Sequence, residues 1–180
     1  EPLKAIPYYQ KSLELKEAEK DLKGAISTRL NLASLLAAHG RWADLAPQIE
    51  KILAAAKEAK DERAEAYGQL LKGQSFGAAG EWQFAIGPLS IALGLFQRVA
   101  DGEGELTATM STAESAIELR DGGHAYVLLK SAQEMAERRK DGPRSARILT
   151  LFNRLDHLFA APGQAPTTTP TRPCSSWPSA

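Results

Sequence analysis

Residues 21–60 read DLKGAISTRLNLASLLAAHGRWADLAPQIEKILAAAKEAK, and this stretch decides the fold. It contains two runs, 22–39 and 42–60, in which apolar residues recur every three or four positions. That spacing predicts two one-sided α-helices. Gly40 ends the first helix, because glycine adopts a left-handed conformation without steric cost. The apolar positions are Ile26, Leu30, Ala33, Leu45, Ile49, Ile52, Leu53 and Ala56.

The same pattern recurs along the chain with a period of 40 residues. An aspartate opens each period, and its carboxylate suits the unpaired N–H groups of a helix start. Residues of the same type recur at positions 40 apart: Asp21, Asp61, Asp101 and Asp141; Gly40 and Gly80; Trp42 and Trp82; and the small residues Ala33, Gly73 and Ala113. We therefore predict units near 1–20, 21–60, 61–100, 101–140 and 141–160. Their helices should lie near 2–17, 22–39, 43–60, 62–79, 83–100, 104–119, 123–139 and 143–159, without any sheet. With a helix start at about Ala43, Pro47 should lie near the end of a first turn, where a missing N–H costs little.

Composition agrees with an all-α chain and excludes several classes. Alanine, the best helix former, supplies 30 of 180 residues. Lysine and arginine (22) balance aspartate and glutamate (22), so the chain lacks the positive excess of a nucleic-acid binder. No apolar run approaches the ~18 residues of a membrane span. The single cysteine, Cys174, and the scattered histidines predict no metal site, and no motif predicts a cofactor.

Two segments at the ends of the chain differ from the repeats. Residues 161–180 hold five of the ten prolines and no acidic residue, so we expect a disordered, Pro/Thr/Ser-rich tail. The chain opens on a second helix, near residues 2–17, without the first helix of that pair. We therefore expect more of the protein upstream of Glu1, because a solenoid unit does not bury its apolar face alone.

The runs Asn31-Leu32-Ala33 and Leu35-Leu36, followed by Gly40 and Trp42, resemble the tetratricopeptide repeat. The variety most similar is the long form of about 40 residues found in kinesin light chains, and the resemblance covers residues 1 to about 160. It implies a right-handed α-solenoid of about four units of antiparallel helix pairs. It also implies a concave wall that binds a peptide or helix of a partner protein.

The resemblance implies that the concave wall is formed by one face of the first helix in each helix pair. These positions lie four and three residues apart, so they are neighbours on one helical face. The predicted partner-binding residues are Ser27, Asn31, Ser34, Tyr67, Leu71, Gln74, Thr107, Ser111, Glu114, Arg147, Leu151 and Arg154. The stripe is mostly neutral and hydrogen-bonding, with Tyr67 as an aromatic anchor and a basic end at Arg147 and Arg154.

Three local motifs allow other readings. Gly73-Gln74-Ser75-Phe76-Gly77 matches the G-x-S-x-G elbow of α/β-hydrolases, but no strand is predicted before it, and Gly73 lies on the small-residue register. Residues 138–154 are strongly basic, which fits either a solvated helix end or a dock for an acidic partner. Residues 170–173 form a PxxP match, which fits either a ligand of an SH3-like domain or a linker or vector-derived sequence, because such matches arise easily in a proline-rich segment.

We therefore predict a non-enzymatic protein-interaction module. The alternative is a regulatory or sensor segment of a larger signalling enzyme or transcription regulator. The sequence upstream of Glu1 would discriminate between the two.

Overall fold

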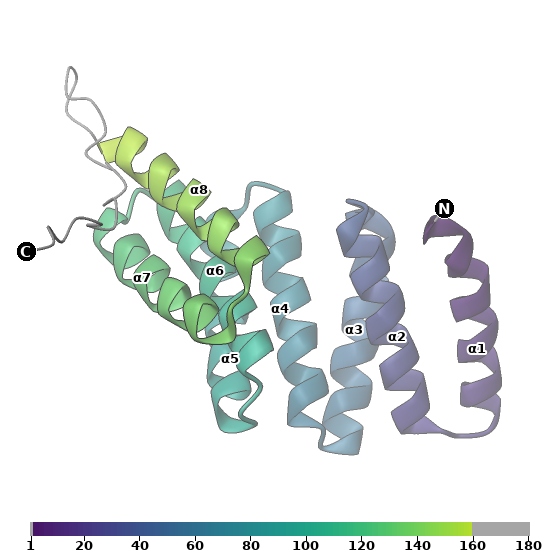
Figure 1. Ribbon diagram of the computed structural model, residues 1–180. Coiled ribbons are helices and arrows are strands. Elements are labelled where there is room, and N and C mark those ends of the chain that lie inside the picture. Colours follow the sequence, from purple (N-terminus) through teal and green to yellow (C-terminus); the bar gives the residue numbers. More distant parts are fainter. Residues whose placement is uncertain (1, 160–180) are drawn as a thin grey trace, which may run out of the picture.

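The computed structural model describes residues 2–159 as an array of helices without a strand (Figure 1). A short 3₁₀ turn, Pro2–Ala5, precedes the first α-helix. The α-helices are α1 (Ile6–Ala18), α2 (Leu22–Ala38), α3 (Trp42–Ala59), α4 (Glu62–Ala78), α5 (Trp82–Arg98), α6 (Gly102–Glu118), α7 (Gly122–Arg139) and α8 (Gly142–Phe159). The tail predicted at 161–180 lies outside the described residues.

The aspartates begin helices as the sequence predicts. In α2, α4 and α6, the carboxylates of Asp21, Asp61 and Asp101 accept hydrogen bonds from the backbone N–H three residues later, at 2.9 to 3.0 Å. Asp121 and Asp141 do the same for α7 and α8, at 3.1 Å. Each bond satisfies one of the N–H groups that a helix start leaves unpaired.

A residue with left-handed backbone conformation follows each helix from α1 to α7. Gly40 and Gly80 have φ of 67° and 77°, as their places after α2 and α4 require. At the other five turns the left-handed residue is not glycine. These residues are Lys20, Lys60, Ala100, Arg120 and Lys140, with φ between 53° and 61°. A side chain in this conformation costs roughly 1–2 kcal/mol, so these turns hold some strain.

Two details of the predicted helices are wrong. Residues 2–5 form a 3₁₀ turn rather than the first turn of an α-helix. Pro47 was expected near the end of a first turn, but α3 already begins at Trp42, so Pro47 lies inside the helix. Its missing N–H therefore removes one bond of the helix ladder. Pro88 likewise lies inside α5.

Each helix packs against the next, and a second set of contacts gives the array its shape. The even helices also touch one another, α2 with α4, α4 with α6 and α6 with α8. Within the described residues, the odd helices make no comparable contacts among themselves. The even helices are therefore closer together, so they form the inner layer of a curved stack. The chain is an all-α solenoid of antiparallel helix pairs.

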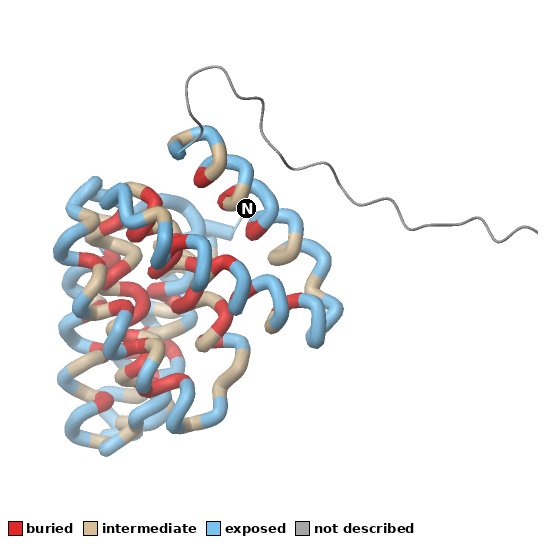
Figure 2. Tube along the Cα trace, turned by 90° about the vertical axis from the view of Figure 1, so that its left-hand side faces the viewer, coloured by how far each residue is buried: buried red, intermediate tan, exposed pale blue. Residues whose placement is uncertain are grey.

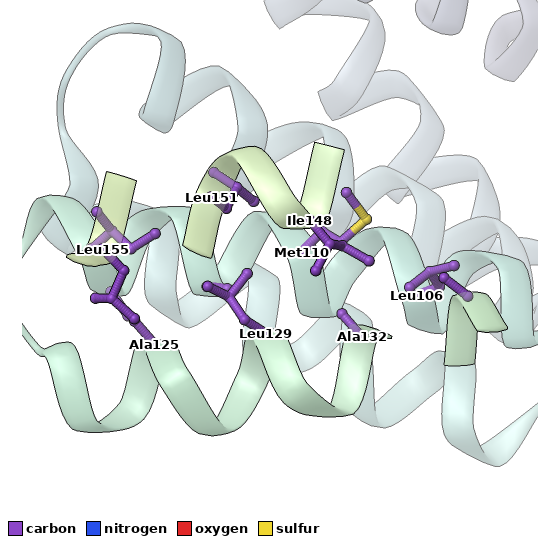
Figure 3. Close-up of a cluster of buried hydrophobic side chains, with 12 residues drawn as sticks. Leu106, Met110, Ala125, Leu129, Ala132, Ile148, Leu151 and Leu155 are labelled. Atoms are coloured by element: carbon purple, nitrogen blue, oxygen red, sulfur yellow. The ribbon is translucent and has the colours of Figure 1, made fainter. Parts of the chain in front are cut away.

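The core runs along the stack rather than around one centre. Figure 2 shows buried positions threaded through the array between the helices. The largest cluster joins α6, α7 and α8, where Met110 and Leu129 pack with Ile148 and Leu155 (Figure 3). Three further clusters lie along the stack: one joins α1, α2, α3 and α4, one joins α4, α5 and α6, and a small one joins α2, α3 and α4. Burial of these leucines and isoleucines contributes roughly 1.5–3 kcal/mol for each side chain.

A close helix contact lies between α4 and α5. A Cβ placed on Gly73 would lie 2.5 Å from Leu89 Cγ and 3.2 Å from the Ala85 carbonyl oxygen. The small-residue register that the sequence shows at Gly73 therefore has a packing reason.

Candidate functional site

Two adjoining hollows lie on the inner layer. The larger, of about 570 Å³, is bounded by α2, α4 and α6, with Arg144 of α8 at its edge. The smaller, of about 380 Å³, lies between the ends of α2 and α4, the starts of α3 and α5, and α6. Ala37 and Gln74 line both, so the two hollows adjoin at these residues.

Most of the stripe chosen from sequence lines these hollows. The residues of the stripe in the larger hollow are Ser27, Asn31, Ser34, Tyr67, Leu71, Gln74 and Thr107. Those in the smaller are Gln74, Ser111, Glu114 and Arg147. Gln74 Nε2 donates to Ser111 Oγ at 3.2 Å, which joins α4 to α6 where the hollows meet. The stripe is therefore one continuous surface across three helices.

Two members of the stripe differ from the rest. Leu151 is buried in the cluster between α6, α7 and α8 and lines neither hollow. It is a core residue, because its side chain packs with Ile148 and Leu155. Arg154 also lines neither hollow. Leu71 is nearly buried and forms an apolar floor of the larger hollow.

Tyr67 is held firmly rather than standing free as an anchor. Its hydroxyl donates to Asp101 Oδ2 at 3.1 Å, and Arg63 Nε donates to the same oxygen at 2.8 Å. The Tyr67 ring packs edge to face against the Phe96 ring, with their centroids 4.9 Å apart. Burial and the neighbouring carboxylate raise the pKa of Tyr67. Tyr67 thus joins the start of α6 to α4 and also lines the larger hollow.

Asp101 is the centre of this network. Its side chain is only 7% exposed. Burial by itself would raise the pKa of Asp101, but hydrogen bonds from Gly104 N–H and Tyr67, with the charge of Arg63, outweigh it and hold the pKa below its ordinary value. Asp101 therefore stays ionised, and it caps α6 while tying α4 to it.

The basic end predicted from sequence is largely neutralised. Arg147 pairs with Glu114 at 3.3 Å, and Arg154 pairs with Glu114 at 3.9 Å and with Glu118. Arg144 pairs with Glu103 at 2.8 Å and with Asp141. These arginines of the 138–154 segment join α8 to α6, so their charge is compensated within the array.

Sequence reasoning missed the outer rim of the larger hollow. Lys23, Arg63 and Glu103 line it, each one helical turn before the first chosen residue of its helix. Extending the stripe by four residues toward each helix start would have found them. Trp42 and Trp82 line the smaller hollow. Their shared register was visible in the sequence, but their position on second helices gave no reason to place them in the groove.

The other motifs do not form sites in the described part of the chain. Gly73 to Gly77 lies inside the continuous helix α4, not at a strand–helix elbow. Among residues 2–159, no three histidine, cysteine, aspartate or glutamate side chains gather as a metal site would require. No helix there has the length and apolar character needed to cross a bilayer. The PxxP match and Cys174 lie outside the described residues.

Comparisons with known proteins identify the fold. No family model matches the sequence, and no curated protein matches it. Among solved structures, the apo form of RapI is similar with a TM-score of 0.75 and 16% sequence identity, over 88% of this chain. The aligned part is 62% of the RapI chain, so this chain spans less than two thirds of it. At that identity the likeness concerns fold alone, and the chain has the helical-repeat fold of that solved structure.

Proposed function

We propose that this protein is a tetratricopeptide-type interaction module, without catalytic activity, that binds a segment of a partner protein in the groove of its inner layer. The observation that carries the proposal is that two hollows adjoin on the inner layer. A stripe chosen from sequence lines them across α2, α4 and α6. Repeat proteins commonly use such extended concave surfaces for binding.

The chemistry of the groove favours recognition of backbone and apolar groups over recognition of charge. Asn31 and Gln74 each offer an amide donor and acceptor to a peptide bond. Leu71 supplies an apolar floor beneath the larger hollow, and Trp42 and Trp82 line the smaller one. These groups suit an extended or helical segment that places apolar side chains in the hollows.

Most charge around the groove is internally paired, and the remaining Lys23 is balanced by Asp61 of the same lining, so net attraction is small. Arg63 pairs with Asp101, Arg144 with Glu103, and Arg147 with Glu114. Binding should therefore depend only weakly on salt, since screening acts on uncompensated charge. A tenfold rise in salt should change the affinity less than about threefold.

The test is a peptide-display selection against the full 180-residue chain, followed by calorimetry with the selected peptide. The variant Asn31→Ala/Gln74→Ala removes two groove amides and leaves the Tyr67–Asp101 network intact. We expect affinity to fall about tenfold or more, as for loss of two hydrogen bonds. The control, Lys51→Ala/Ser90→Ala, changes two exposed residues of the outer helices α3 and α5.

Each outcome bears on the assignment. Equal affinity for the groove variant and the wild type, with unchanged circular dichroism, would overturn the groove as the binding surface. A loss caused by the control variant would place binding on the outer face instead.

A further inference from the structure

The outer face of α5 is apolar and is left uncovered by the described residues. α5 packs against α4 on one side and α6 on the other, so it lies in the interior of the array (Figure 1). The helix carries no charged residue from Trp82 to Gln97. Phe84 and Ile91 lie seven residues apart on one face, and they are 57% and 49% exposed. A contiguous exposed apolar face of this kind marks a contact surface.

Two glycines on the same face have no packing role within the described chain. Gly87 and Gly94 alternate with Phe84 and Ile91 at spacings of three and four residues, and both are exposed. Each weakens the helix relative to alanine. A Cβ on either would meet no neighbouring atom within 4 Å, whereas a Cβ on Gly73 would lie 2.5 Å from its nearest neighbour. The missing side chains therefore leave room for another helix to approach α5 closely from outside.

This face is complementary to itself in size. Phe84 and Gly94 each lie five residues from position 89, and Gly87 and Ile91 each lie two residues from it. In an antiparallel pair of α5 helices related by a two-fold axis at that level, Phe84 of one copy is level with Gly94 of the other. Ile91 is likewise level with Gly87 of the other copy. Each large side chain thus finds a glycine at its own level, so the surface that fits this face best is a second copy of it.

Charges at the two ends of α5 favour the same antiparallel arrangement. Glu81 lies just before the helix and Arg98 is its last residue. They are eight and nine residues from position 89, so an antiparallel pair brings Glu81 of one copy close to the level of Arg98 of the other. A parallel pair would bring Arg98 to the level of its own copy, and like charges repel.

We propose that two copies of this protein form a dimer through the outer faces of α5, with the two helices antiparallel about a two-fold axis. The contact is isologous, because both copies use the same surface, so association stops at the dimer. The odd helices form the outer layer of a curved stack, so α3 and α7 bend away and one helix pair supplies most of the contact. Such a small interface is a weak one. The groove lies on the inner layer, so the dimer leaves it open and does not depend on its function.

The experiment is analytical ultracentrifugation of the full chain over a hundredfold concentration range, with reductant so that Cys174 forms no crosslink. The weight-average mass should rise from 19.4 kDa toward twice that value and no further. Ile91→Glu places a charge in the contact and should weaken self-association at least about tenfold. The control Leu149→Glu makes the same kind of change at a 57% exposed residue of α8 and should associate like wild type. Both residues are exposed, so circular dichroism should show both variants folded.

A second variant tests the close fit rather than the apolar character of the face. Gly87→Ala/Gly94→Ala adds apolar surface and improves helix propensity, so the monomer should be at least as stable as wild type. The two methyl groups fill the room beside Phe84 and Ile91 of the other copy. Self-association should therefore weaken about tenfold. A non-specific apolar contact would instead be unchanged or stronger.

The orientation of the pair is measured with a spin label at residue 97 in the variant Gln97→Cys/Cys174→Ser. Residue 97 is eight residues from position 89. Two labels in the antiparallel dimer should therefore lie about 24 Å apart along the helices, at 1.5 Å for each residue. A parallel dimer would hold them closer than about 15 Å.

Five results would overturn the proposal. A chain that stays monomeric at every concentration shows that the α5 face serves another protein or segment, and a mass beyond the dimer shows that the contact is not two-fold. Wild-type association of Gly87→Ala/Gly94→Ala excludes close packing at the glycines. Equal losses for Ile91→Glu and Leu149→Glu show that a different surface associates. A short distance between the labels excludes the antiparallel pair.

Discussion

Replacing Gly73 with alanine adds a single methyl group at a close contact between α4 and α5. Its Cβ would lie 2.5 Å from Leu89 Cγ, whereas ordinary contact begins near 3.4 Å, so the atoms must separate by about 0.9 Å. Leu89 is buried at the edge of the smaller hollow, and the Ala85 carbonyl oxygen, a backbone atom that cannot turn away, blocks the other side at 3.2 Å. Overpacking of this kind costs about 1–3 kcal/mol.

The same change also improves helix propensity, which offsets part of the cost. Glycine in a helix is about 0.5–1 kcal/mol less favourable than alanine. The net loss for Gly73→Ala should therefore be about 1–2 kcal/mol. Gly94 on α5 is the matched control, because a Cβ there meets no atom within 4 Å. Gly94→Ala keeps only the propensity gain and should stabilise the protein by about 0.5–1 kcal/mol.

Urea unfolding followed by circular dichroism at 222 nm measures both variants. The two midpoints should move in opposite directions from wild type, by roughly 0.5–1 M for Gly73→Ala at the usual urea dependence. If Gly73→Ala were stabilising like Gly94→Ala, the close packing of α4 on α5 at this register would be refuted.

Three other predictions concern the turns, the Asp101 network and the outer face. Ala100→Gly should raise the free energy of unfolding by about 1 kcal/mol, because glycine removes the cost of a side chain at φ 53°, and a lowered urea midpoint would contradict this. Asp101→Asn keeps the helix cap but loses the charge that pairs with Arg63, so it should lose about 1 kcal/mol at pH 7. The folded pKa of Asp101 lies below the unfolded value of about 4, so its contribution to stability is full above that pH and is lost as pH falls through the folded pKa. The difference in thermal stability between Asp101→Asn and wild type should therefore shrink in melts from pH 6 to pH 2. A difference that stays constant over this range would count against the network. Lys57→Leu, on the exposed face of α3, should change stability by less than about 0.5 kcal/mol, and a larger shift in calorimetry would show that the register is misassigned.

The repeat could be predicted from the sequence because the features that mark it depend only on nearby residues. An aspartate cap needs only the N–H three residues on, and a helical face needs only its own spacing. Helix positions near Asp61 and Gly40 could therefore be predicted within a few residues. Pro47 was misplaced because a proline does not itself reveal how many residues of a helix precede it.

The electrostatics of the groove could not be predicted in the same way. Arg147 meets Glu114 only after α6 and α8 come together, 33 residues apart in sequence. The pattern places each residue on the chosen face of its helix, and the family resemblance implies that this face is concave, but neither predicts that their charges cancel. Tyr67 was likewise identified as a groove residue, whereas its bond to Asp101 depends on how α4 and α6 are placed. Contacts between units need the three-dimensional stack.

The hydrogen bond from Gln74 to Ser111 has a mechanical consequence. It is a direct link between α4 and α6 within the inner layer, and it lies where the two hollows meet. A bound segment that takes the Gln74 amide for itself would release this link, and the distance between the two helices could then change. Because the stack is curved, a small change in that spacing alters its pitch and moves α1 and α8 relative to each other. Binding in the groove would thus change the distance between the two ends of the array.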